Sequence, residues 1–137
     1  MAQKLEARLT SSLPLALSVF RVIFGLLFLM HGLSGVIGWP AAGHVAPVGQ
    51  WPGFYAAWIE LITGALITLG LLTRPAAFLA SGEMAFAYFT AHFPNGFFPI
   101  NNNGEASVMY CFAFLLLVFA GGGRYAFDGQ HRVRLRR

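Results

Sequence analysis

Long apolar runs separated by short polar or glycine- and proline-rich breaks dominate the chain. Two long connections, residues 38–53 and 94–104, alternate with one tight turn at residues 73–75. The apolar runs predict four transmembrane helices, each close to the ~20 residues needed to cross a bilayer. They cover residues 13–37, 54–72, 76–93 and 105–120. We therefore predict one all-α membrane domain over residues 1–137, built as a four-helix bundle.

The basic residues predict how these helices are oriented. Apart from Arg21, every lysine and arginine lies in the N-terminal segment, in the tight turn or in the tail at residues 121–137. Neither long connection contains one. Because cytoplasmic segments hold the excess of lysine and arginine, we predict that both termini are cytoplasmic and both long loops extracytoplasmic. The tail is best explained as a topological anchor, with an anionic lipid or a soluble partner as the alternative.

Composition agrees with a chain that lies almost wholly in the lipid bilayer. Hydrophobic residues make up 57% and charged residues 10% of the sequence, and the mean hydropathy is +0.64. A soluble domain of this length is usually more polar. The net charge of +4 is not concentrated on a polar face interleaved with aromatic residues, so we expect no nucleic-acid partner. The single cysteine, Cys111, excludes a disulfide within this chain.

A few polar residues within this apolar sequence form a candidate site. His31 and Glu60 should lie at a similar depth, ~9 Å from the extracytoplasmic ends of the first two helices. His92 ends the third helix and Glu105 begins the fourth on the same side, next to Asn103. These five residues predict an extracytoplasmic pocket for proton transfer or ligand binding.

Two other interpretations of these residues remain open. Histidine and carboxylate side chains can bind a divalent metal, but no ExxH or HxxxH spacing occurs, and we therefore assign no metal site. Alternatively, His31–Glu60 and His92–Glu105 are buried hydrogen-bonded pairs that fix the helix register.

A second pair of charged residues lies deeper in the predicted bundle. Glu83 shares a helix face with the small residues Ala80, Ala87 and Ala91, so this face should contact protein rather than lipid. Arg21 falls at a compatible depth in the first helix. Since an unpaired charge in the bilayer is costly, we predict an Arg21–Glu83 ion pair or a neutral Glu83.

Four stretches in order resemble a known family. They are RVIFGLLFLMHGLSG, IELITGALITLGLLTRPAA, GEMAFAYFTAHFPNGFFPINNNGEASVMYCFAFLLL and GGGRYAFD, and together they span residues 21–128. The chain resembles the DoxX family of small four-helix bacterial membrane proteins. This resemblance implies a plasma-membrane protein related to the DoxD-like subunit of thiosulfate:quinone oxidoreductase. It also implies that the polar residues named above occupy the family's recurrent polar positions. Relatives usually carry a lysine shortly after the first-helix His-Gly, where this chain has Ser34 and Gly35.

These observations support two hypotheses from different classes. In the first, the protein is a quinone-linked redox subunit without a covalently bound cofactor, and its pocket binds the quinone head group and exchanges protons. Its electrons then come from a partner or from the quinone pool. In the second, it is a non-catalytic scaffold whose tail recruits soluble enzymes. A small-solute or proton transporter is a third possibility, for which four short helices leave little room unless the protein forms a homo-oligomer.

Overall fold

A computed structural model describes residues 1–129 of the protein. All of the regular secondary structure in this part of the chain is helical and none is β-strand, which confirms the all-α prediction. There are four main helices, and one short helix, α4, lies in the connection between the last two of them. The α-helices are α1 (Ala2–Ile37), α2 (Gly53–Leu69), α3 (Thr73–Ala87), α4 (Pro99–Asn102) and α5 (Glu105–Ala120). A π-helical turn (Tyr88–His92) and a 3₁₀ turn (Phe93–Asn95) extend α3. Residues 130–137 of the predicted basic tail lie outside the described residues.

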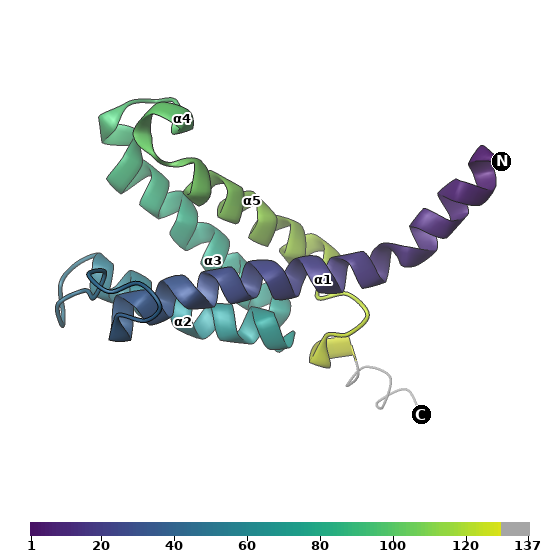
Figure 1. The fold of residues 1–137 in the computed structure, drawn as a ribbon, viewed down its shortest axis with the longest axis horizontal. Coiled ribbons are helices and arrows are strands. Elements are labelled where there is room, and N and C mark those ends of the chain that lie inside the picture. The colour runs from purple at the N-terminus through teal and green to yellow at the C-terminus, as the bar shows by residue number, and fades with distance from the viewer. Residues whose placement is uncertain (130–137) are drawn as a thin grey trace.

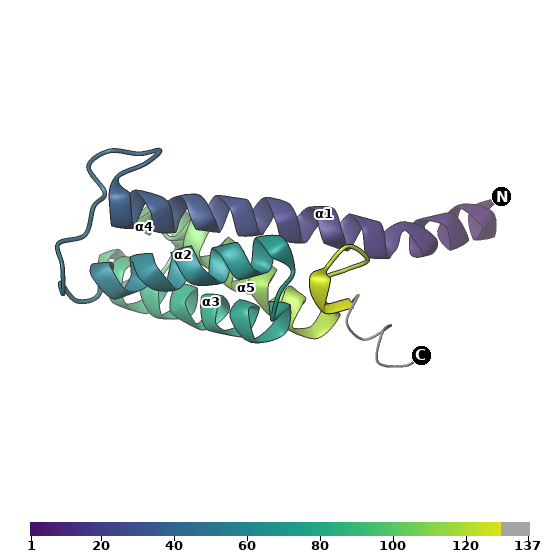
Figure 2. The same ribbon diagram turned by 90° about the horizontal axis from the view of Figure 1, so that it is seen from below.

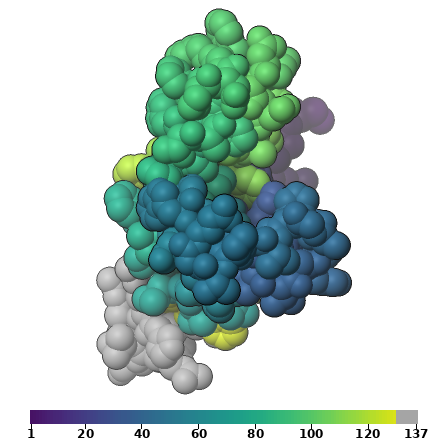
Figure 3. All heavy atoms as spheres, turned by 90° about the vertical axis from the view of Figure 1, so that its left-hand side faces the viewer, coloured from purple at the N-terminus to yellow at the C-terminus, as the bar shows by residue number. Residues whose placement is uncertain are grey.

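The main helices are arranged as two pairs. Helix α1 packs along α2, α3 packs along α5, and α2 joins the pairs by packing on α3. Figure 1 shows that α1 and α5 diverge from one another towards α4, and Figure 2 shows α2 running alongside α1. Seen from that end, the loop of residues 38–52 and the segment around α4 form two adjoining masses (Figure 3). The residues predicted to form one pocket therefore belong to different helix pairs. His31 and Glu60 lie on the α1–α2 pair, and His92, Asn103 and Glu105 lie with the α3–α5 pair.

The first helix is longer than predicted. It begins at Ala2 rather than near residue 13, so the N-terminal segment before the apolar run is also helical. Ser11 and Ser12 do not cap a helix start, because their hydroxyls donate back to the carbonyl of Arg8 within the helix. Pro14 lies inside α1, and the helix bends in this region in Figure 1. A proline removes one backbone hydrogen bond and crowds the preceding turn, which explains the bend.

The other predicted boundaries hold to within a few residues, with two differences. Helix α2 ends at Leu69, because Gly70 adopts a left-handed conformation with φ 73°. The third predicted helix changes from α to π geometry at Tyr88, a few residues before Pro94. The predicted loop at residues 94–104 contains α4. The fourth predicted helix is confirmed at both ends.

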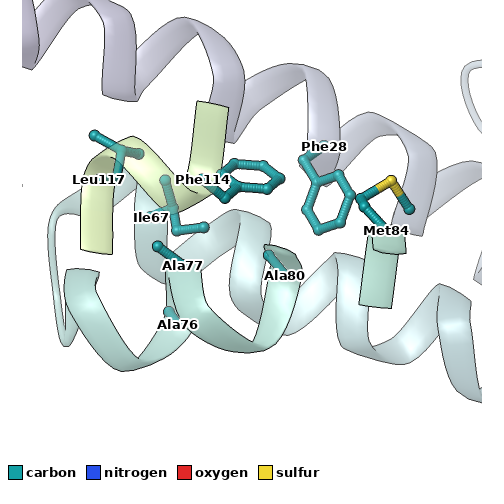
Figure 4. Packing of buried hydrophobic residues seen from close by; sticks show 8 residues of the cluster. All are labelled: Phe28, Ile67, Ala76, Ala77, Ala80, Met84, Phe114 and Leu117. Carbon is teal, nitrogen blue, oxygen red and sulfur yellow. The ribbon is translucent and has the colours of Figure 1, made fainter. Parts of the chain in front are cut away.

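The core lies where the two pairs meet. Phe28 of α1 and Phe114 of α5 are almost fully buried and meet edge to face, with ring centroids 4.7 Å apart. The small side chains of Ala77 and Ala80 on α3 leave room for these rings, as Figure 4 shows. Ile67, Ala76, Met84 and Leu117 complete the cluster.

Glycines bring α1 and α2 into close contact. A Cβ atom on Gly32 would collide with the backbone of Leu61, and one on Gly64 would lie 2.6 Å from the amide nitrogen of Leu29. The backbones of the two helices therefore approach more closely than larger side chains would allow, as is common between membrane helices.

Much of the outer surface is apolar. Large side chains such as Ile23, Phe78, Phe112 and Phe119 are exposed, Phe119 by 73%. Only α1 among the described helices is both long and apolar enough to cross a membrane by length and composition, while α2 and α5 are apolar but shorter. Soluble monomers rarely expose apolar surface on this scale, so the surface suits a lipid environment.

Candidate functional site

His31 of α1 contacts a tyrosine that the sequence analysis did not single out. The imidazole meets the ring of Tyr110, on α5, edge to face with centroids 5.7 Å apart. His31 is otherwise exposed, and it also interacts electrostatically with His44 in the loop of residues 38–52. Tyr110 is half-buried. This contact is one of the side-chain links between α1 and α5.

Two carboxyl groups on α2 and α3 belong to the same neighbourhood. Glu60 interacts electrostatically with Tyr110 and with Glu83. Both glutamates are half-buried, and Glu83 Oε2 is a buried atom without a hydrogen-bond partner in residues 1–129. We call His31, Glu60, Glu83 and Tyr110 the central group. Each of the four main helices thus contributes one titratable side chain to it.

Aromatic rings surround Tyr110. The centroid of its ring lies 5.4 Å from that of Phe28, 5.7 Å from that of Phe114 and 5.9 Å from that of Phe24. Apolar surroundings strengthen electrostatic interactions because little water is present to screen them. The central group therefore combines titratable side chains with flat apolar surfaces.

Arg21 is not part of the central group, and the predicted ion pair with Glu83 does not form. Arg21 is 2% exposed, and its guanidinium donates to the carbonyls of Ile67 and Thr68 at the end of α2. It also donates to the carbonyls of Gly122 and Tyr125, which follow α5. The C-terminal carbonyls of a helix carry partial negative charge and lack partners within the helix, so they can take the place of a carboxylate.

The segment after α5 closes this end of the molecule. The amide of Tyr125 donates to Ser18 Oγ, and the amide of Arg124 donates to the carbonyl of Pro14, both in α1. Asp128 accepts hydrogen bonds from the amides of Leu72 and Thr73 and so caps the N-terminus of α3. The GGGRYAFD stretch therefore fastens α1, α2 and α3 together.

His92 lies in a separate group of residues between α3 and α5 that is built around Asn102. We call Tyr88, His92, Gly96 and Asn102 the outer cluster. Asn102 is buried, donates to the carbonyl of Gly96 at 2.7 Å and accepts from the amide of Gly104 at 2.8 Å. His92 Nδ1 lies 3.1 Å from the carbonyl oxygen of Asn102, and its ring stacks on Tyr88. These contacts fold the segment between α3 and α5 back on itself.

The other two predicted residues near His92 have different surroundings. Asn103 is exposed in a left-handed conformation with φ 59°, which asparagine tolerates better than most residues. Glu105 is exposed in the first turn of α5, where its charge suits the positive end of the helix. The sequence therefore indicated the correct segment, but Asn102 rather than Asn103 makes the buried contacts.

The predicted five-residue pocket is thus divided in two. Tyr110 brings His31 and Glu60 into one group, whereas His92, Asn103 and Glu105 belong to the α3–α5 end. No hydrogen bond or ion pair joins His31 to Glu60 or His92 to Glu105 in the described part of the chain. Within residues 1–129, no three histidine, cysteine, aspartate or glutamate side chains come together as metal ligands.

Tyr110 and Asn102 were missed for different reasons. Tyr110 lies in an apolar run, where no sequence pattern distinguishes it from a core aromatic residue, although a tyrosine hydroxyl within a membrane helix usually needs a polar partner. Asn102 was one of three consecutive asparagines, and helical periodicity does not apply to a loop. Only the loop's own turn geometry distinguishes them.

Comparison with known proteins places the chain in a family. A sequence model described as DoxX matches residues 16–93, more than half of the chain. The chain belongs to the DoxX family. It is also 38% identical over 122 residues to a protein of Haemophilus influenzae described as uncharacterized, a match that covers 85% of this chain and 91% of that relative. No solved structure matches it significantly. The resemblance noted from sequence is therefore confirmed, and three members of the central group, His31, Glu60 and Glu83, lie within the matched DoxX region.

Proposed function

We propose that this DoxX protein is an integral subunit of the bacterial plasma membrane that crosses the bilayer four times. The exposed apolar surface and the placement of basic residues support this topology. Helices α2 and α5 are 17 and 16 residues long and so reach about 25 Å, which interfacial residues and local bilayer thinning can extend. The turns that continue α3 lengthen that span in the same way.

We propose that the central group exchanges protons with the head group of a membrane quinone. The observation that carries this proposal is Glu83, whose Oε2 is buried without a hydrogen-bond partner in residues 1–129 while Glu60 lies close enough to repel its charge. Burying two negative charges in apolar surroundings is costly, so the two carboxyls would hold a proton between them. Intramembrane carboxyl groups of this kind commonly mark proton pathways.

The residues around the central group fit a quinone. A planar ring could pack on the aromatic side chains beside Tyr110, and His31 is exposed at the edge of the group. Reduction of a quinone takes up two electrons and two protons. The protons would pass through Glu83, Glu60 and the Tyr110 hydroxyl, and His31 would exchange them with the outside. Because the chain has one cysteine and cannot cycle a dithiol, the electrons would come from a redox partner or from the quinol pool.

A titration of the purified protein with a soluble ubiquinone or menaquinone analogue tests this proposal. We expect Glu83→Gln and Tyr110→Phe to weaken binding at least tenfold, because each removes a group that would hydrogen-bond to the quinone head group or exchange a proton with it. Glu105→Gln is the matched control, since it neutralises an exposed glutamate in the first turn of α5, next in the chain to the outer cluster. If Glu105→Gln weakens binding while Glu83→Gln does not, the quinone site belongs at the outer cluster and the proposal is wrong. Unchanged binding in all three variants would exclude both positions.

A further inference from the structure

A cavity lies at the other end of the molecule, away from the central group. Its volume is about 930 Å³, and it is open to the surroundings. Helix α1 contributes Leu13 and Leu17, and the end of α5 contributes Ala120, so these walls are apolar. The start of α3 and the glycine-rich segment after α5 form the remaining walls.

Two arginines line this cavity without a carboxylate partner. Arg74 and Arg124 are both exposed, and neither forms a hydrogen bond or an ion pair through its guanidinium to any side chain in the described part of the chain. The Arg74 guanidinium lies over Gly121, since a Cβ built there would be 3.5 Å from Arg74 Nη2. Asp128 also lines the cavity, but its carboxylate is bonded to backbone amides at the start of α3. Amide hydrogen bonds leave the charge of Asp128 in place, so the two arginines and this one carboxylate give the described lining a net charge of +1.

Thr73 provides a third, independent observation. Its side chain lines the cavity and is 1% exposed, and its Oγ1 has no hydrogen-bond partner in residues 1–129. A buried hydroxyl without a partner is uncommon and costs stability. A ligand oxygen at this wall of the cavity would satisfy it.

We propose that this cavity binds the phosphate group of an anionic phospholipid. Arginine side chains suit phosphate oxygens, and the apolar walls suit the first carbons of an acyl chain, which soluble phosphate lacks. In the topology proposed above, the cavity lies at the cytoplasmic face of the bilayer, where anionic headgroups are available. The proposal does not depend on quinone binding at the central group.

Lipid retention by the full-length protein tests the proposal. The protein is purified from mixed phosphatidylglycerol and phosphatidylcholine membranes, and bound lipid is measured by native mass spectrometry. We expect selective retention of phosphatidylglycerol, reduced about fivefold by Arg74→Gln or Arg124→Gln and about 30-fold by both together, if each arginine contributes as a basic residue near a charged leaflet does. The control variant, Lys4→Gln with Arg8→Gln, removes two exposed charges outside the cavity and should retain lipid as the native chain does.

A second variant separates the cavity from general surface charge. Thr73→Val removes the unpartnered hydroxyl without changing charge. We expect it to leave the melting temperature in phosphatidylcholine unchanged or raised, and to reduce the additional stabilisation that phosphatidylglycerol provides. Equal lipid loss from the Lys4/Arg8 control, or full retention by the double arginine variant, would overturn the proposal. Protection by inorganic phosphate equal to that by phosphatidylglycerol would show a soluble-phosphate site instead.

Discussion

For Arg21, the sequence predicted that the side chain has a partner within the protein, but it did not predict which partner. Its position in an apolar helix correctly indicated that it must have a partner within the protein. The partner was wrong, because the sequence pattern offers Glu83 as the obvious opposite charge. Four backbone carbonyls bind the guanidinium instead, two of them from the segment after α5. That segment has no helical periodicity, so its return to α1 could not be predicted.

Arg21→Met should be strongly destabilising. The variant keeps a long side chain but leaves the carbonyls of Ile67 and Gly122 without their donor in a buried site. We expect a loss of about 3 kcal/mol or more in the free energy of unfolding. Reversible denaturation in mixed micelles measures it, with exposed Arg8→Met as the control. A loss below about 1 kcal/mol would show that these bonds contribute little.

Glu83→Gln should have the opposite effect on stability. The substitution removes the repulsion between Glu83 and Glu60 and replaces a buried carboxyl with a neutral amide of the same shape. We expect the free energy of unfolding to stay the same or rise by about 1 kcal/mol. Glu105→Gln should change it by less than about 0.5 kcal/mol, because Glu105 is exposed. Marked destabilisation by Glu83→Gln would mean that the carboxyl is structural.

At the scale of helices, the close approach of α1 and α2 depends on glycine. Gly32→Ala would force the two backbones apart, since the new methyl group meets the backbone of Leu61. We expect a loss of about 1–3 kcal/mol in the same unfolding assay. Gly82→Ala in α3 is the matched control. Apart from its chain neighbours and the adjoining backbone of α3, no atom lies within 4 Å of its added Cβ, so the substitution should stabilise the helix by about 0.5–1 kcal/mol. Equal effects of the two variants would argue against glycine-dependent packing.

The N-terminus of α3 depends on a residue far away in the sequence. Asp128→Ala removes the acceptor for the amides of Leu72 and Thr73. We expect a loss of about 1–2 kcal/mol and faster hydrogen exchange at these two amides. Unchanged exchange there would show that water replaces the carboxylate without cost.

At the scale of the whole molecule, the number and type of the main helices could be predicted from sequence, but their arrangement could not. Apolar runs of sufficient length define helices α2, α3 and α5 almost without reference to other residues. The divergence of the two pairs towards α4 depends on which side chains fill the interface, such as Phe28 and Phe114 against alanines. His31 and Glu60, which were predicted to lie at equal depth, do share a neighbour in Tyr110. His92 and Glu105 were predicted at the same depth, but they lie with the other helix pair.

In the function that we propose, Glu83 holds a proton that it exchanges with a bound quinone. Infrared difference spectroscopy of the protein in lipid, recorded while a bound quinone analogue is reduced electrochemically, measures the carboxyl C=O band itself. We predict a band change from a protonated carboxyl that disappears in Glu83→Gln and persists in Glu105→Gln. A spectrum without a carboxyl change, or one that Glu83→Gln leaves intact, would contradict the claim.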